Sequence, residues 1–491
     1  MNHVVVVGGG ISGLATAHRL VEQAGDRLRV TVLEAGRRWG GKVQSERRDG
    51  FVIDAGPDSF IPQKPQTLEL VRALGLGEQL LASNDQDRGL AIVHRGKLEP
   101  VPGGLHTLVP KDWQAIRRSP LLTWRGRLGL WRERWVPARA DEAGDESVAD
   151  FARRRFGDEV FERLAEPMLS HIHVGDAERM SLAATYPRFA AMEHRHGGFF
   201  RAHEARRAGG ASGGRPGTSA APARPPGRGK TPLFWSLAGG MGQLIEALVQ
   251  RLGEADLRKG VAVRSITPGN PADPRWRVET SEGPGLRADA VVLAAPTFAA
   301  ADMVRAWAPQ LALGLDSIRY VSLATLSLGF RRRDVAQLPA GFGFFVPKGA
   351  PLRLLAGTWS STKFEGRAPD DRVLVRLFLG GATQEGVLAL EDDALVAAVR
   401  ADLAALTGLE AEPILTHLER WKRGYPQYEV GHLERVRNLT AALPEGLHLV
   451  GSGYGGVGLS DCIRGGYGAA DRVVEGLREA REALVMEGVA G

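Results

Sequence analysis

The sequence predicts an α/β protein with a nucleotide-binding domain, and three observations lead to this prediction. First, the short apolar run at residues 4–7 leads into a glycine-rich turn, and the apolar side chains after the turn have helical spacing. Second, the apolar run at 447–450 also leads into a glycine-rich loop and a helical segment. Third, similar runs at 30–33 and 290–295 are typical of parallel strands covered on both faces. Segments from both ends of the chain are therefore expected to meet in one sheet.

The composition agrees with a large folded protein. The chain has 491 residues, 43% hydrophobic and 24% charged, which excludes wholesale disorder and fibrous structure. Its 63 basic and 57 acidic residues give a net charge of +6, a small excess that predicts no nucleic-acid partner. The one cysteine, Cys462, excludes an internal disulfide and fits a reducing compartment. Without a signal peptide or an apolar run of about 20 residues, we expect a cytoplasmic protein that does not span a membrane.

The first glycine-rich turn fits the pattern G-x-G-x-x-G between a strand and a helix. Glycines at this spacing permit a tight turn, a close approach of a pyrophosphate to the backbone, and close packing of the helix on the strand. The N-terminus of the helix then favours the phosphate charge. Glu34 ends the next strand about 20 residues further on, where a carboxylate accepts hydrogen bonds from ribose hydroxyls. The other residues of this predicted dinucleotide site are Gly8, Gly9, Gly10, Ile11, Ser12 and Gly13.

The residues after Glu34 indicate which dinucleotide is bound. The segment 34–42, Glu-Ala-Gly-Arg-Arg-Trp-Gly-Gly-Lys, resembles the extended fingerprint of the glutathione-reductase-like FAD flavoproteins. This resemblance implies FAD as the cofactor, a Rossmann-like FAD-binding domain, and cofactor contacts from Gly41 and Lys42. Such proteins commonly have Arg at the position of Lys42, and Lys keeps the charge without the bidentate geometry. Lys42 is therefore expected to be either a phosphate ligand or a solvated surface charge.

Further blocks narrow the resemblance to one family. They are Asp-Ala-Gly-Pro-Asp-Ser-Phe at 54–60, Glu-Pro-Met-Leu-Ser at 166–170 with Val-Gly-Asp at 174–176, Gly-Phe-Gly-Phe-Phe-Val-Pro at 341–347, Arg-Trp at 420–421 with Pro-Gln-Tyr at 426–428, and Gly-Val-Gly-Leu-Ser-Asp-Cys-Ile at 456–463. In this order the chain resembles the protoporphyrinogen and coproporphyrinogen oxidases, except at 203–231. The resemblance implies FAD-dependent oxidation of protoporphyrinogen IX or coproporphyrinogen III by dioxygen, with release of hydrogen peroxide, late in haem biosynthesis.

The same resemblance implies which further residues contact FAD. Those along the isoalloxazine ring are Gly56, Pro57, Asp58 and Ser59. Val263 would meet the adenine through its backbone, and Trp421 would contact the flavin. The loop expected to face the ring from the start of the last helix consists of Val457, Gly458 and Leu459. A helix N-terminus at this place would favour negative charge on the reduced ring. We expect Cys462 in the core and not in a covalent link to the flavin.

The substrate of this family is a flat macrocycle with propionates, which needs apolar walls and a cation at the pocket mouth. Phe345 and Trp359 lie in blocks that line the pocket in the family, and Arg88 is the candidate partner of a propionate. His171 stands where the family usually has glycine, so it is expected either to narrow the pocket or to meet a carboxylate. His171 and His173 alone do not predict a metal site, and no catalytic acid–base residue is predicted.

We expect three domains and one disordered insertion. The FAD-binding domain is predicted to combine residues 1–65, 232–297 and 440–491, a mixed α/β substrate domain to combine 66–104 and 298–439, and a mainly helical domain to span 105–200. The segment 203–231 is rich in Gly, Ala, Ser, Pro and Arg and predicts disorder. Nothing in the sequence indicates the oligomeric state.

Two alternative functions and one surface property stay open. The chain could be another flavin oxidase or desaturase, acting on amines or carotenoids, or a non-catalytic prenyl-binding module on the same fold. An apolar helical face flanked by arginines predicts peripheral contact with an anionic membrane. The residues of this face are Leu121, Trp124, Leu128, Trp131 and Trp135. The alternative is a helix packed in the core.

Overall fold

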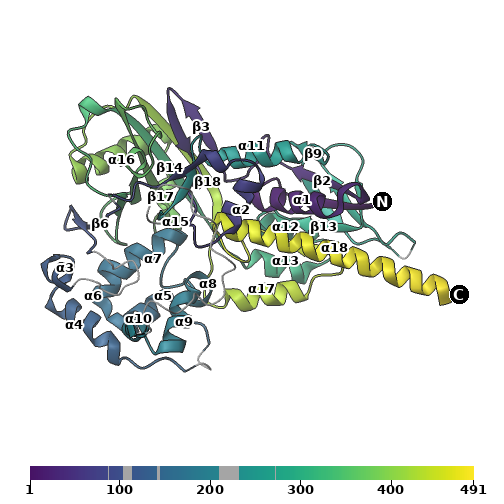
Figure 1. Ribbon diagram of the computed structural model, residues 1–491, viewed down its shortest axis with the longest axis horizontal. Coiled ribbons are helices and arrows are strands. Elements are labelled where there is room, and N and C mark those ends of the chain that lie inside the picture. The colour runs from purple at the N-terminus through teal and green to yellow at the C-terminus, as the bar shows by residue number, and fades with distance from the viewer. Residues whose placement is uncertain (87, 103–112, 141–143, 209–231, 271, 491) are drawn as a thin grey trace.

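A five-stranded parallel sheet forms the centre of one half of the molecule (Figure 1). The computed structural model describes residues 1–491 except 87, 103–112, 141–143, 209–231, 271 and 491. The sheet order is β19-β13-β1-β2-β9, and its strands are β1 (Asn2–Val7), β2 (Leu28–Glu34), β9 (Asp256–Lys259), β13 (Ala290–Leu293) and β19 (Leu447–Leu449). The α/β fold class is confirmed, and segments from both ends of the chain meet in this sheet.

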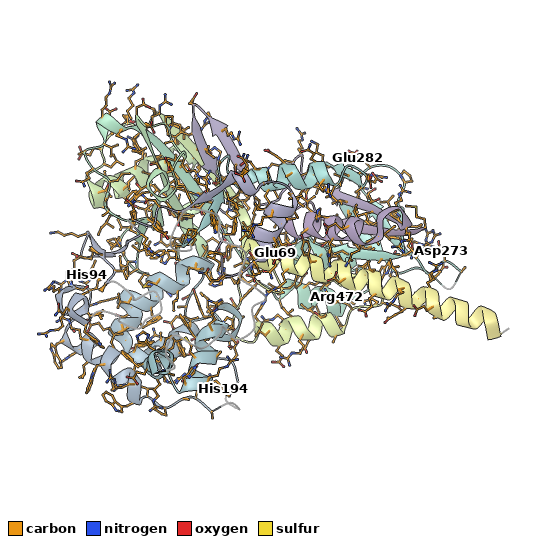
Figure 2. The ribbon with its side chains drawn as sticks, viewed as in Figure 1. Glu69, His94, His194, Asp273, Glu282 and Arg472 are labelled. Carbon is orange, nitrogen blue, oxygen red and sulfur yellow. The ribbon has the colours of Figure 1, made fainter. Side chains whose placement is uncertain are left out.

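Helices cover both faces of this sheet because its apolar residues alternate between the faces. Val4 and Val6 pack in a core with α1 (Ile11–Ala24), α2 (Gln66–Ala73), α11 (Gly242–Arg251) and α18 (Leu459–Ala490). Val5 and Val7 pack on the other face with α12 (Thr297–Val304), α13 (Pro309–Asp316), and the strands β10 (Val263–Thr267), β11 (Trp276–Thr280) and β12 (Leu286–Ala288). Figure 2 labels Glu69 of α2 and Arg472 of α18, two exposed side chains on the covering helices.

A seven-stranded mixed sheet forms the second layer, in the order β18-β14-β17-β16-β15-β6-β7. Its strands are β6 (Leu90–His94), β7 (Lys97–Pro100), β14 (Tyr320–Arg331), β15 (Gly343–Phe345), β16 (Leu354–Trp359), β17 (Arg372–Gly380) and β18 (Leu415–Pro426). The helix α16 (Asp392–Thr407) packs on it through an apolar core of its own. Two small antiparallel pairs join the layers: β3 (Ser45–Arg48) with β4 (Phe51–Asp54), and β5 (Leu80–Ala82) with β8 (Trp235–Leu237).

A group of helices lies below the second sheet in Figure 1. Its main members are α3 (Trp113–Arg118), α4 (Trp124–Arg132), α5 (Val148–Phe156), α7 (Glu166–His173), α9 (Pro187–His196) and α10 (Phe199–Ala208). Their core is rich in phenylalanine. The predicted insertion at 203–231 needs one correction, because α10 continues to Ala208 and its first six residues are therefore helical. Residues 209–231 lie outside the described residues.

A buried ion network holds this helical group together. Arg155 of α5 and Glu133 are both fully buried and form an ion pair. The guanidinium also donates to Glu193 and to the carbonyl of Gly197, each at 3.0 Å. Glu133 accepts the backbone N–H groups of Phe199 and Phe200. The network thus ties α5 and α9 to the start of α10.

Candidate cofactor and substrate site

The glycine-rich turn lies between β1 and α1 and leaves room for a ligand. A Cβ atom at position 13 would lie 1.9 Å from the carbonyl oxygen of Gly8, so Gly13 permits α1 to pack on the strand. A Cβ atom at position 9 would lie 2.4 Å from the Trp39 ring. A Cβ atom at position 10 would meet nothing within 4 Å. This open space at the N-terminus of α1, where Ile11 and Ser12 begin the helix, fits a pyrophosphate.

Glu34 at the end of β2 lies beside this turn. Its carboxylate accepts hydrogen bonds from the N–H groups of Gly9 at 2.7 Å and Gly36 at 2.6 Å. Its backbone carbonyl accepts from Val261, which brings the start of β10 next to the turn. Val263 follows two residues later with its side chain buried in the core, so only its backbone is available to a ligand. The carboxylate and the β10 backbone therefore stand together at the predicted adenosine end.

Gly41 and Lys42 pass close to the same turn. A Cβ atom on Gly41 would lie 3.2 Å from the Cα of Gly10. One on Gly56 would lie 1.6 Å from the Lys42 carbonyl oxygen, so the segment at 56–59 packs directly on this passage. Burial lowers the pKa of Lys42 below its ordinary value, and the nearby Cys462 thiol opposes that shift only in part. Of the two alternatives for Lys42, the burial of its ammonium group argues against a solvated surface charge.

Trp421 of β18 reaches the segment predicted to line the isoalloxazine ring. Its indole Nε1 donates to the carbonyl oxygen of Ala55 at 3.2 Å, next to Gly56. The Arg38 guanidinium lies over the indole, 5.8 Å from the ring centroid. The structure therefore brings together three segments that are far apart in the sequence, at 34–42, 54–59 and 421.

The last glycine-rich loop closes the site at the N-terminus of α18. The loop residues Val457, Gly458 and Leu459 stand at the start of this helix. In its first turn, Asp461 forms an ion pair with Lys64, and the Ser460 hydroxyl lies 2.6 Å from that of Thr67. Cys462 is buried in the core, and burial raises the pKa of its thiol. The loop is thereby fixed to the segment that follows residues 56–59.

Three buried cations behind the segment 54–59 were not predicted. Arg367 forms an ion pair with Asp54 at 3.1 Å, and Lys363 forms one with Asp58 at 3.0 Å. Arg376 donates to the carbonyl oxygens of Ala55 and Gly56. A sequence signal existed for Arg376, since it interrupts the apolar run of β17.

These cations oppose the effect of burial on the pKa of the two carboxylates, with different outcomes. Burial acts to raise the pKa of Asp58, but Lys363 and Arg376 outweigh it and hold the pKa well below its ordinary value. For Asp54, burial dominates and raises the pKa in spite of Arg367. Asp58, itself one of the predicted flavin contacts, is therefore held as a carboxylate.

His171 and Phe345 lie in contact between α7 and β15, with ring centroids 5.5 Å apart. The Nδ1 atom of His171 lies 2.6 Å from the Pro167 carbonyl oxygen, which can only accept, so Nδ1 carries the proton. Burial lowers the pKa of His171 to about 4, and the imidazole is neutral at pH 7. It lines a small pocket together with Glu166, Ser170, Val346 and Leu355. A neutral ring favours the narrowing of a pocket over an ion pair with a carboxylate.

The structure does not support the other two predicted substrate contacts. Trp359 is fully buried and packs 5.5 Å from Phe344 in the core beneath α16. Residues 344 and 345 point to opposite faces of the sheet, and Trp359 shares the core face with Phe344, so it is not a wall of a pocket beside Phe345. Arg88 is half-exposed and lies 3.7 Å from Asp85. None of its described contacts reaches His171.

Comparisons with known proteins agree with this arrangement. A family model described as flavin containing amine oxidoreductase matches residues 11–474. The chain is 32% identical to coproporphyrinogen III oxidase of Bacillus subtilis (strain 168), across 95% of this chain and 97% of that protein. It is 30% identical to protoporphyrinogen oxidase 1, chloroplastic, of Arabidopsis thaliana, across 96% and 87%. A solved structure described as a protoporphyrinogen oxidase from Exiguobacterium sp. 255-15 has a TM-score of 0.81 and 31% identity, across 96% and 98%.

Proposed function

Because the chain belongs to the flavin-containing amine oxidoreductase family, we propose that it oxidises a porphyrinogen to the porphyrin with dioxygen as electron acceptor. FAD is the cofactor. The candidate substrates are coproporphyrinogen III and protoporphyrinogen IX, after the names of the relatives. The observation that carries the proposal is the contact between Trp421 and the segment at 54–59, because it joins two separate blocks of the porphyrinogen oxidase pattern.

The chain's own residues bind and orient the reactants in this proposal. The turn at 8–13 and Glu34 hold the pyrophosphate and ribose, Val263 meets the adenine, and residues 56–59, Trp421 and 457–459 surround the ring. Bound FAD would accept a hydride, two electrons at a time, so the loss of six hydrogens takes three rounds and three dioxygen molecules, each reduced to hydrogen peroxide. No side chain is required as a general acid or base.

A side-by-side assay tests the function. Purified protein is given coproporphyrinogen III or protoporphyrinogen IX in air, and porphyrin fluorescence and hydrogen peroxide are followed, with spontaneous oxidation subtracted. We expect turnover of at least one substrate with about three peroxides per porphyrin. Turnover of amines or carotenoids instead would assign the chain to another branch of the family. A purified protein without flavin absorbance would favour a prenyl-binding module.

We expect His171→Gly to change the substrate KM and to leave FAD content unchanged. Removing the ring opens space beside Phe345, so the KM should change by about three- to tenfold, the effect of roughly 1 kcal/mol of lost or gained contact. Because the pKa of His171 is lowered to about 4, its titration contributes nothing between pH 6 and 8, and the variant should keep the wild-type pH profile in that range. Steady-state kinetics from pH 6 to 8 measure both. Ile172→Ala, an exposed neighbour on α7, is the control, and a wild-type KM in His171→Gly would remove His171 from the substrate pocket.

We further propose that the helical group contacts an anionic membrane surface through a tryptophan patch, which consists of Trp124, Leu128, Trp131 and Trp135. Their side chains are 67%, 49%, 46% and 53% exposed. Leu121 is fully buried and lies three residues before the start of α4. It therefore does not belong to the patch. Arg125 and Arg132 on α4 are exposed, Arg125 lies over the Trp124 ring, and Arg134 lies over the rings of Trp131 and Trp135. Arg117 and Arg118 at the end of α3 are exposed as well. Indoles with arginines suit the headgroup level of an anionic bilayer.

Vesicle sedimentation tests this surface. The wild-type protein should co-sediment with phosphatidylglycerol-containing vesicles at low salt and dissociate in high salt. The double variant Trp124→Ser, Trp131→Ser should stay in the supernatant, while the control Leu313→Ser, an exposed apolar residue on α13, should bind as the wild type does. Wild-type protein that stays in the supernatant at low salt would contradict the proposal. In the described residues no helix is long and apolar enough to cross a bilayer.

A further inference from the structure

Arg376 is a buried cation that no carboxylate in the described part of the chain neutralises by an ion pair. Its side chain is 4% exposed, and it stands in the middle of β17. The other two cations of the cluster each have a carboxylate partner, Arg367 with Asp54 and Lys363 with Asp58. Even with both carboxylates ionised, the five groups carry one excess positive charge. Arg376 is the cation without an ion-pair partner among the described residues, although its charge also lowers the pKa of Asp58.

The hydrogen bonds of Arg376 go to two consecutive peptides of the segment 54–59. Its terminal NH2 group donates to the carbonyl oxygen of Ala55 at 3.0 Å and to that of Gly56. Its Nε atom is buried without a hydrogen-bond partner among the described residues, and its guanidinium lies 4.8 Å from the Phe378 ring centroid. Keeping a guanidinium here costs free energy, because burial removes its hydration. An apolar side chain at position 376 would fill the same space in the core without this cost.

The orientation of the peptide between Ala55 and Gly56 follows from these contacts. In a planar trans peptide the C=O and N–H bonds point in opposite directions. Arg376, the Thr325 hydroxyl at 2.9 Å and the Trp421 indole all donate to the Ala55 carbonyl oxygen. The N–H of Gly56 therefore points away from Arg376. Only glycine fits at this place, because a Cβ atom would collide with the Lys42 carbonyl oxygen.

We propose that Arg376 is a positioning residue that presents the Gly56 N–H to the flavin and that its charge raises the reduction potential of bound FAD. The inference rests on the proposed placement of residues 56–59 along the ring. Reduction adds negative charge to the cofactor. A buried cation on the far side of the Ala55–Gly56 peptide, with no ion-pair partner among the described residues, favours the reduced form in a low-dielectric interior.

The experiment compares Arg376→Met, Arg376→Gln and Arg376→Lys by the midpoint potential of bound FAD, measured in spectroscopic dye titrations without any porphyrinogen. We expect the Met and Gln variants to lower the ratio of reduced to oxidised FAD at a given solution potential about tenfold, which is about 30 mV for a two-electron couple. Arg376→Lys keeps the charge and should stay close to the wild type. Arg372→Met is the matched control, since Arg372 lies on the same strand and also donates to a backbone carbonyl, that of Asp49, at 2.7 Å.

Each outcome decides the proposal. A wild-type potential in Arg376→Gln, or an equal shift in Arg372→Met, would overturn it. If neither neutral variant retains FAD but Arg376→Lys retains it at the wild-type potential, the need for a cation is supported. Loss of FAD from Arg376→Lys as well would assign the residue to the core and overturn the proposal. Because no substrate is present, a protein that fails to oxidise porphyrinogens can still show the potential shift, and the two proposals are separately testable.

Discussion

Replacing Gly10 by valine is expected to abolish FAD binding and to leave the fold intact. Gly10 has φ −73° and ψ 175°, an extended conformation that valine adopts readily. A Cβ atom there meets no protein atom within 4 Å, so the new side chain starts in the open space where the pyrophosphate is predicted to lie. We expect the purified variant to carry less than about a tenth of the wild-type FAD, because the phosphates can no longer approach the backbone. Flavin absorbance per protein and far-UV circular dichroism measure the two properties.

Two further variants make this result specific. Gly77→Val also adds a side chain where no atom lies within 4 Å, but it does so away from the turn and should keep full FAD content. Gly13→Val should lose FAD together with the fold, because its Cβ atom would lie 1.9 Å from the Gly8 carbonyl oxygen. Stoichiometric FAD in Gly10→Val would mean that the pyrophosphate lies elsewhere.

Arg155→Met is expected to destabilise the helical group more than any surface substitution in it. The change removes the guanidinium and leaves Glu133 fully buried opposite an apolar side chain. Breaking a buried ion pair from one side costs about 3–5 kcal/mol. Urea unfolding followed by tryptophan fluorescence should therefore show an early transition of the helical group, which contains Trp113, Trp124, Trp131 and Trp135.

Arg153, two positions earlier on the same helix, provides the control for this prediction. Arg153 is about one-third exposed, and its ion pair with Glu178 is solvated. Arg153→Met should cost no more than about 1 kcal/mol, because exposed ion pairs contribute little. Equal unfolding midpoints for Arg153→Met and Arg155→Met would show that the buried network adds no stability.

The parts of the site that depend on local signals could be predicted from the sequence. A glycine-rich turn is fixed by steric limits within a few residues, and the apolar runs at 4–7 and 290–293 identify buried parallel strands directly. The resemblance in several blocks then predicted that Trp421 and residues 56–59 belong to one site. The contact of the Trp421 indole with Ala55 agrees with that prediction, although the ligand contacts themselves stay predictions.

The parts that depend on which face of an element is covered could not be predicted. Trp359 and Phe345 both occur in family blocks, but the packing of α16 decides that Trp359 lies in the core. Leu121 fits the helical spacing of the tryptophan patch, yet the helix begins three residues later, at Trp124. The ion pair of Lys363 with Asp58 joins residues about 300 positions apart, and no local pattern specifies it.

The order of strands in the five-stranded sheet has a consequence for biosynthesis. The edge strand β19 and the loop before α18 come from the last tenth of the chain, whereas the turn at 8–13 is made first. α18 also packs along α1, so part of the apolar face of α1, which is translated early, stays uncovered until α18 has been made. A chain that has not yet made β19 and α18 therefore lacks the loop at 457–459 that is predicted to face the flavin. A chain terminated before β19 would expose the buried sides of β13 and α1 and would be a substrate for chaperones and proteases.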